Sequence, residues 1–239
     1  MIHERYEVVK KIGEGATATV FLLWDKLLER YVAAKCGTDK EVLCAEAKYM
    51  AMAVSGNVPS LYDYVENQEM GILFMEYILG ETLSDRLNRI EIYTTEEAIQ
   101  ILVEVAKMLG VIHHAQTPCV YGDLKPENIM IQPDGRVRLI DLGAVTKIDE
   151  HGTQEGRKKK RGATQGYAAP EVWSSKPDIR NDIYSLGKLM MFFAHHATGL
   201  LEHKEYMRIA EKCTAKELKY RYANMDEFLS DMEILLRQK

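Results

Sequence analysis

One segment limits the fold of this chain more than any other, because it sets polar groups at fixed offsets around a proline. Residues 121–128 read Tyr-Gly-Asp-Leu-Lys-Pro-Glu-Asn. Pro126 fixes its own φ angle and is incompatible with the interior of a regular helix. The sequence therefore predicts a rigid loop from which Asp123, Lys125 and Asn128 project.

A short hairpin is predicted directly after this loop. The apolar runs 129–131 and 137–140 flank Gln-Pro-Asp-Gly, in which Gly135 can take the positive φ that a tight turn requires. The hairpin would bring Asp141 back beside Asn128. A carboxylate and an amide oxygen placed in this way suit an octahedral ion with a preference for oxygen, such as Mg²⁺.

The polar groups of the loop have a plain interpretation and a chemical one. In the plain interpretation, Asp and Asn cap a turn in an ordinary α/β protein. In the chemical interpretation, Asp123 is free to orient a hydroxyl group and Lys125 can meet a transferred phosphoryl group. We favour the chemical interpretation because other features of the chain agree with it.

Two glycines between two predicted strands form a second feature. Residues 6–12 and 19–24 have the composition of strands, and Gly13 and Gly15 lie between them. Glycines in such a place let backbone N–H groups approach a phosphate closely, although many glycine pairs are plain hairpin turns. A dinucleotide-binding βαβ unit is disfavoured, because its glycines would have to open a helix.

A lysine and a glutamate are both expected on faces that are otherwise apolar. Lys35 lies in the predicted strand 31–36, and a buried ammonium group needs a partner. In the predicted helix Glu41–Val54, the helical period places Glu46 on one face with Leu43, Met50 and Ala53. A surface salt bridge is the simpler alternative, but we expect a functional pair between Lys35 and Glu46.

The order of these motifs resembles that of eukaryotic-type Ser/Thr protein kinases, in a form that looks bacterial. Asp-Leu-Lys-Pro-Glu-Asn at 123–128 matches the catalytic loop of that family, and Asp-Leu-Gly at 141–143 resembles its metal-binding Asp-Phe-Gly. The glycine pair resembles the start of the family's glycine-rich loop, and Val-Ala-Ala-Lys at 32–35 resembles its Val-Ala-Ile-Lys. The chain departs from the family at Tyr121-Gly122, where the family has His-Arg, at Leu142 for Phe, and at Ala18 for the third glycine.

The resemblance implies a two-lobed, protein-kinase-like α+β fold over residues 1–239. It places a small antiparallel β-rich N-lobe at about 1–77, a hinge at about 76–80 and a larger, mainly helical C-lobe at about 81–239. It also implies ATP as the bound nucleotide, with Mg²⁺ or alternatively Mn²⁺. The positions that match the family's ATP site are Ile12, Gly13, Gly15, Val20, Ala33, Lys35, Glu46, Met75, Glu76, Ile78 and Met130.

The same resemblance implies a role for each polar residue of the site. Asn128 and Asp141 would hold the metal, Asp123 would accept the proton of the substrate hydroxyl, and Lys125 would stabilise the transferred charge. Met75 corresponds to the gatekeeper, and backbone groups of Glu76 and Ile78 would meet the adenine edge.

The residues after Asp141 bear on the class of substrate. Residues 162–171 resemble the family's peptide-binding loop with its Ala-Pro-Glu end, which small-molecule kinases lack. Thr164 would lie beside the catalytic Asp. Three further residues would be structural: Glu171 and Arg221 would pair, and Asp182 at a helix N-terminus would hold the catalytic-loop backbone. The basic run 157–161 is interpreted as a solvated tip, with docking of an acidic substrate or an anion as the alternative.

Composition sets outer limits on the function. A chain of 239 residues fits one large domain or two lobes sharing a cleft, and a net charge of −5 argues against general nucleic-acid binding. No run of eighteen apolar residues and no signal-peptide core occur, so we expect no membrane segment and a cytoplasmic location. The four cysteines are scattered without a Cys-x-x-Cys pair and are interpreted as reduced thiols.

The sequence thus favours a signalling enzyme that phosphorylates Ser or Thr hydroxyls of proteins with ATP. The Lys two residues after the catalytic Asp resembles the Ser/Thr subgroup of the family. A nucleotide-binding pseudokinase scaffold is one alternative, and filled polar catalytic positions count against it. A small-molecule phosphotransferase is the other, and the Ala-Pro-Glu segment counts against that one.

Gly122 predicts that activity does not depend on a phosphorylated activation segment. In the family, the Arg at this place pairs with a phosphate on that segment, and Gly122 offers no charge for such a pair. We expect the double variant Thr146→Val, Thr153→Val, assayed after phosphatase treatment, to match untreated wild type. A tenfold loss, worth about 1.4 kcal/mol, would contradict this expectation.

Overall fold

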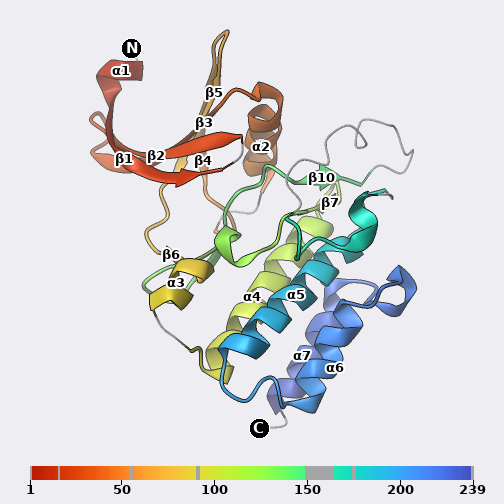
Figure 1. Ribbon diagram of the computed structural model, residues 1–239. Coiled ribbons are helices and arrows are strands. Elements are labelled where there is room, and N and C mark those ends of the chain that lie inside the picture. The colour runs from red at the N-terminus through yellow and green to blue at the C-terminus, as the bar shows by residue number, and fades with distance from the viewer. Residues whose placement is uncertain are drawn as a thin grey trace. The chain divides into compact units, whose positions relative to one another are not determined.

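The protein folds into two compact units, seen in a computed structural model that describes residues 2–15, 17–53, 56–89, 92–148, 164–173 and 176–237 (Figure 1). The first unit comprises Met1–Leu79 with Ile140–Gly143, and the second comprises Gly80–Leu139 with Ala144–Lys239. The chain passes from one unit to the other between Leu79 and Gly80, and the expected lobe and hinge boundaries stay a prediction.

An antiparallel five-stranded sheet forms the first unit, in the order β1-β2-β3-β5-β4. The strands are β1 (Tyr6–Glu14), β2 (Ala18–Asp25), β3 (Arg30–Gly37), β4 (Leu61–Glu66) and β5 (Gly71–Glu76), preceded by the short helix α1 (Ile2–Arg5). Helix α2 (Lys40–Met52) packs against β4 and β5 (Figure 1). Its buried residues are Leu43, Glu46, Ala47 and Met50, so three of the four residues of the predicted stripe are buried. The fourth, Ala53, lies just after the helix in an extended conformation.

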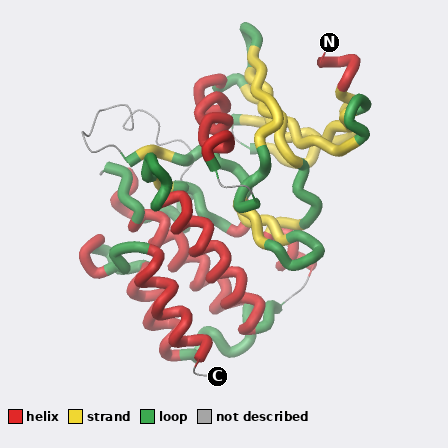
Figure 2. The backbone as a smooth tube through the Cα atoms, turned by 180° about the vertical axis from the view of Figure 1, so that it is seen from behind, coloured by secondary structure: helices red, strands yellow, loops and turns green. Residues whose placement is uncertain are grey.

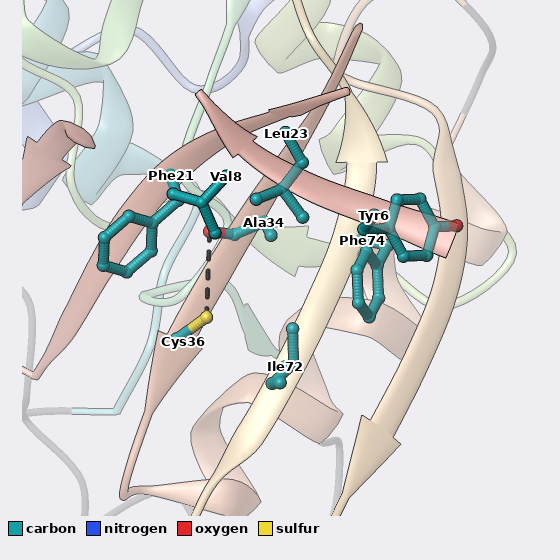
Figure 3. Close-up of a pocket in the computed structure, with 8 residues that line it drawn as sticks. All are labelled: Tyr6, Val8, Phe21, Leu23, Ala34, Cys36, Ile72 and Phe74. Carbon is teal, nitrogen blue, oxygen red and sulfur yellow. Dashed lines mark hydrogen bonds between the residues drawn. The ribbon is translucent and has the colours of Figure 1, made fainter. Parts of the chain in front are cut away.

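The two faces of this sheet carry different residues, because side chains alternate along a strand. On the face away from α2, a buried cluster of Leu23, Val32, Ala34 and Phe74 forms the core, and Tyr6 stacks on Phe74 at 4.8 Å. A pocket of about 200 Å³ opens on the same face, lined almost wholly by apolar side chains (Figure 3). The alternation directs the neighbouring residues Ala33 and Lys35 to the opposite face.

Helices dominate the second unit. They are α3 (Leu83–Arg89), α4 (Thr95–His113), α5 (Arg180–His196), α6 (Lys204–Cys213) and α7 (Met225–Arg237). Helices α4 to α7 pack side by side in Figures 1 and 2. Helix α4 begins with a capping box, in which Thr94 and Glu97 are each bonded to the backbone of the other. Short strands complete the unit: β6 (Glu81–Thr82), β8 (Ile129–Ile131) and β9 (Val137–Leu139) in one sheet, and β7 (Cys119–Val120) with β10 (Thr146–Lys147) in another.

The α+β class predicted from the sequence is confirmed, and so is the hairpin after residue 128. Strands β8 and β9 pair in antiparallel fashion, and Gly135 has a φ of +84°. The loop before them is more regular than predicted, because Pro126–Asn128 form one turn of 3₁₀ helix with Pro at its first position. Thr153 and the basic run 157–161 lie outside the described residues.

Two glycines inside helices should respond oppositely to replacement by Ala. A Cβ atom at Gly187 in α5 would lie 2.5 Å from Cβ of Cys213 in α6, whereas one at Gly110 in α4 would lie 3.6 Å from Cβ of Met225. We expect Gly187→Ala to lower the free energy of unfolding by about 1–3 kcal/mol through overpacking. Gly110→Ala, the matched control, should raise it by up to about 1 kcal/mol through helix propensity. Urea denaturation of both variants checks this, and equal effects would contradict it.

Candidate active site

The carboxylate of Asp123 is surrounded by hydrogen-bond donors from three residues: Thr164, and Lys125 and Asn128 of its own loop. Its Oδ1 accepts from the backbone N–H of Thr164 at 3.0 Å and from the Thr164 hydroxyl at 2.7 Å. Its Oδ2 accepts from Nδ2 of Asn128 at 3.0 Å and lies 2.8 Å from Nζ of Lys125. Lys125 also donates to the Thr164 hydroxyl at 2.8 Å. The carboxylate is therefore held in one orientation, with only 9% of Asp123 exposed.

The side-chain amide of Asn128 is oriented by the same residue. Its Nδ2 donates to the backbone oxygen of Asp123 at 2.9 Å as well as to the carboxylate. Because the nitrogen faces Asp123, the amide oxygen is directed away from it. That oxygen is a suitable ligand for Mg²⁺, so the residue fits the metal-binding role that the resemblance implies.

A buried carboxylate holds the backbone just before Asp123. Asp182, in the first turn of α5 and fully buried, accepts from the backbone N–H of Tyr121 at 2.7 Å and of Gly122 at 2.9 Å. Nε2 of His113 in α4 lies 2.8 Å from the same carboxylate. The sequence reasoning missed His113, although it continues the apolar stripe of α4 four residues after Leu109.

Gly122 is required by the backbone at this point. Its φ is +86°, a conformation that residues with a side chain rarely adopt. A Cβ atom there would also lie 2.8 Å from the carbonyl oxygen of Ala144. The departure from the family's His-Arg is thus matched by a close approach between the catalytic loop and the segment that enters β10.

In the first unit, Lys35 and two carboxylates form one cluster, in which Lys35 and Glu46 are buried and Asp141 is partly exposed. Nζ of Lys35 donates to Oε1 and Oε2 of Glu46 at 3.0 and 2.8 Å, and to Oδ1 of Asp141 at 2.8 Å. Glu46 also accepts from the backbone N–H of Leu142 at 3.1 Å. Burial disfavours the charged form of Lys35, but the attraction of Glu46 and Asp141 outweighs it, so the pKa of Lys35 is raised. Lys35 therefore stays protonated within the cluster.

Asp141 adopts a strained backbone conformation inside this cluster. Its φ is +66°, a value that typically costs a non-glycine residue about 1–3 kcal/mol. The contact with Lys35 and a bond from the Gly143 N–H to Oδ1 at 3.0 Å oppose that strain. Its side chain is 46% exposed, so part of the carboxylate can bind a cation. The chemistry of this group therefore fits the implied metal site.

The strand register aligns the other residues expected at the nucleotide. Gly13 pairs with Val20, Val20 with Lys35, and Ala33 with Met75. Glu76 ends β5 and pairs with Val32, and Ile78 is buried just beyond. The backbone N–H of Gly15 donates to Ala18 O at 2.8 Å, which closes the glycine turn. Ile12 lies in β1, directly before Gly13, and is 39% exposed. Met130 belongs to β8 of the second unit.

Glu171 and Arg221 form a two-point ion pair. The guanidinium nitrogens lie 2.7 and 2.9 Å from Oε1 and Oε2, and Asn181 Nδ2 donates to Oε1 at 2.6 Å. Burial opposes ionisation of Glu171, but the hydrogen bonds from Arg221 prevail and hold its pKa below the usual value. This contact joins residues that are 50 positions apart in the sequence, and it fixes the end of the segment that begins at Thr164.

Two features thus stand out: a Lys–Glu pair in the sheet unit, and an Asp-x-Lys-x-x-Asn loop in the helical unit. Residues 6–238 match the model of the protein kinase domain. The chain therefore belongs to the protein kinase domain family, and it has the protein kinase fold.

Several curated relatives are similar to the chain. It is 27% identical to serine/threonine-protein kinase PknG of Mycolicibacterium smegmatis, over all of this chain and 33% of that protein. It is 30% identical to sperm motility kinase 3A of Mus musculus, over 80% of this chain and 38% of that protein. A probable serine/threonine-protein kinase of Clostridium acetobutylicum is also 30% identical, over 78% of this chain and 29% of that protein. The chain thus spans about a third of the length of these relatives. Within the described ranges, no helix is both long and apolar enough to cross a membrane.

The Glu171–Arg221 pair predicts a pH-dependent contribution to stability. Because the folded-state pKa of Glu171 is lowered, the pair stabilises the fold above the unfolded-state pKa of about 4.3 and loses its effect as the pH falls through the folded value. We expect Glu171→Gln to lower the free energy of unfolding by about 2 kcal/mol at pH 7. The difference from wild type should narrow below about pH 4, and urea denaturation at both pH values measures it. A difference independent of pH would contradict the assignment.

Proposed function

We propose that this chain transfers the γ-phosphoryl group of ATP to Ser or Thr hydroxyls of protein substrates. The observation that carries the proposal is the fixed carboxylate of Asp123, with Lys125 and the Thr164 hydroxyl beside it. Membership of the protein kinase domain family supports it, and relatives named as serine/threonine-protein kinases agree. The Ala-Pro-Glu end of the segment after Thr164 supports a protein substrate.

In this proposal, Asp123 orients the acceptor hydroxyl and takes its proton as the new P–O bond forms. Thr164 and Asn128 keep the carboxylate from rotating, so it is in place before the substrate arrives. The ammonium group of Lys125, already bonded to Asp123 and Thr164, adds a positive charge where negative charge develops on the phosphoryl oxygens.

The first unit supplies the residues for ATP. Lys35, held by Glu46, binds the α- and β-phosphates, and the backbone of Gly13 and Gly15 lies against the phosphates. Ala33 leaves room for adenine beside Met75, and backbone groups of Glu76 and Ile78 bond its edge, with Ile12, Val20 and Met130 as apolar contacts. Asn128 and Asp141 would hold Mg²⁺, or Mn²⁺ instead, which neutralises charge on the phosphates when it is bound.

The proposal extends to a signalling role in the cytoplasm. All four cysteines are free thiols, and two of them, Cys119 and Cys213, are buried. Burial raises the pKa of the Cys119 thiol. Cysteines that form no disulfide agree with a reducing compartment.

Two substitutions separate the roles of the two carboxylates. With Mg-ATP and a generic acceptor protein, Asp123→Asn should lower turnover about 10²–10⁴-fold and leave the affinity for Mg-ATP nearly unchanged, because it removes the base. Asp141→Ala should weaken both, because it removes a metal ligand. Asp134→Asn is the control, since Asp134 lies in the exposed β8–β9 turn. Radiolabel transfer and calorimetry measure the two quantities.

Two outcomes would count against the assignment. Asp123→Asn retaining more than about a tenth of wild-type turnover would exclude a general base of the usual strength. A Mg-dependent nucleotide affinity that Asp141→Ala leaves unchanged would remove Asp141 from the metal site.

A further inference from the structure

The first residue of α2 is held at two points by the β4–β5 hairpin. The carbonyl oxygen of Lys40 lies 3.0 Å from the hydroxyl of Tyr64, which donates to it from β4. The ammonium group of Lys40 donates to the carbonyl oxygens of Asn67 at 2.9 Å and Gln68 at 3.4 Å. We call these contacts the Lys40 clamp. Both the backbone and the side chain of Lys40 are thus fixed to one hairpin.

The turn that receives the lysine is itself well fixed. Oδ1 of Asn67 accepts from the backbone N–H groups of Glu69 at 2.8 Å and Met70 at 2.9 Å. The backbone N–H of Asn67 donates to Met70 O at 3.0 Å. Side-chain bonds of this kind close a tight turn. The acceptors for the Lys40 ammonium therefore have defined positions.

One glycine makes room for the tyrosine. Gly71, at the start of β5, pairs across the sheet with Gly37 at the end of β3. A Cβ atom at Gly71 would lie 2.9 Å from the Tyr64 hydroxyl oxygen and 3.2 Å from its ring. The bare backbone of Gly71 therefore accommodates Tyr64.

The clamp lies about one and two-thirds turns before Glu46 on the same helix. At 1.5 Å of rise per residue, the six residues from Lys40 to Glu46 span about 9 Å. Only Thr38 and Asp39 connect α2 to β3, and Asp39 caps the helix by accepting from the N–H of Val42 at 3.2 Å. A helix moves as a rigid rod over this length, so a shift of about 1 Å at Lys40 would carry the 2.8 Å contact of Glu46 with Lys35 beyond hydrogen-bond range.

We propose that Tyr64 is a positioning residue for phosphoryl transfer, because through the Lys40 clamp it holds α2 where Glu46 meets Lys35. The inference rests on the proposed kinase function, in which Lys35 and Glu46 bind the phosphates of ATP. The hydroxyl of Tyr64 bonds Lys40 O and Glu66, so Tyr64 acts on the Lys35–Glu46 pair through helix α2.

Glu66 competes with the carbonyl oxygen of Lys40 for the hydroxyl proton of Tyr64, so its replacement should have the opposite effect on the clamp. Its Oε2 lies 2.7 Å from the Tyr64 hydroxyl, so the single hydroxyl proton is shared between Glu66 and Lys40 O. Burial and the bond to Glu66 raise the pKa of the Tyr64 phenol, which keeps that proton in place at neutral pH. In Glu66→Gln, the new amide can donate to the phenol oxygen. The hydroxyl proton is then left for Lys40 O, and the clamp should be at least as strong.

The test compares three variants of the full chain by kinetics and by hydrogen exchange. Tyr64→Phe removes one hydroxyl and should lower kcat/KM for ATP about tenfold, with amides of α2 exchanging at least about fivefold faster than in wild type. Tyr62→Phe is the matched control, because it removes the same atom from a tyrosine of β4 whose ring stacks 3.8 Å from the Arg30 guanidinium. It should stay within about twofold of wild type in both measurements. Glu66→Gln should equal or exceed wild-type kcat/KM.

Three results would overturn the proposal: equal kcat/KM for Tyr64→Phe and Tyr62→Phe, a tenfold loss in Glu66→Gln, or faster exchange in Tyr64→Phe spread evenly over the first unit. The last would show a general loss of stability instead of a displaced helix. The exchange measurement also separates this inference from the proposed function. If wild type transfers no phosphate to any acceptor, the proposed function fails, and unchanged α2 exchange in Tyr64→Phe would still overturn the clamp.

Discussion

The first unit is organised by the need to pair buried charges. A buried ammonium or carboxylate without a partner costs several kcal/mol, so Lys35 and Glu46 can be accommodated only together. Their contact requires β3 to present Lys35 on the α2 face and α2 to present Glu46 among apolar neighbours. Asp141 joins the same cluster and is held there with a positive φ. One electrostatic requirement thus connects strand, helix and the 140–143 segment.

The second unit fixes its polar groups by backbone geometry as much as by charge. Asp182 receives two backbone N–H groups from the catalytic loop, and Gly122 lets that loop approach Ala144. In the family pattern an arginine occupies the position of Gly122. Here Gly122 has a positive φ, and its backbone approaches the carbonyl oxygen of Ala144 too closely for a Cβ atom. The backbone conformation of the catalytic loop therefore depends on Gly122.

The sequence predicted those elements of the fold that depend on a local pattern of residues. Alternation and helical period located β1, β2, β3 and α2, and Pro126 and Gly135 located the loop and the hairpin. Partners that are distant in the chain were less accessible. His113 meets Asp182 across 69 residues, and Tyr64 meets Lys40 across 24, with no motif to signal either contact. The positive φ of Asp141 was also hidden, since the Lys35 contact that helps to hold it there joins residues 106 positions apart.

The carboxylate of Asp182 makes the catalytic loop part of a cooperative folding unit. Asp182 lies in α5, and its carboxylate contacts His113 of α4 and accepts a backbone N–H from the loop. It is fully buried. Opening the loop would leave the buried carboxylate of Asp182 without its backbone donors. Local opening at Tyr121 and Gly122 is therefore coupled to disruption of the helical core. In evolutionary terms, the catalytic loop therefore cannot change independently. A change of its backbone conformation has to remain compatible with the packing of both α4 and α5.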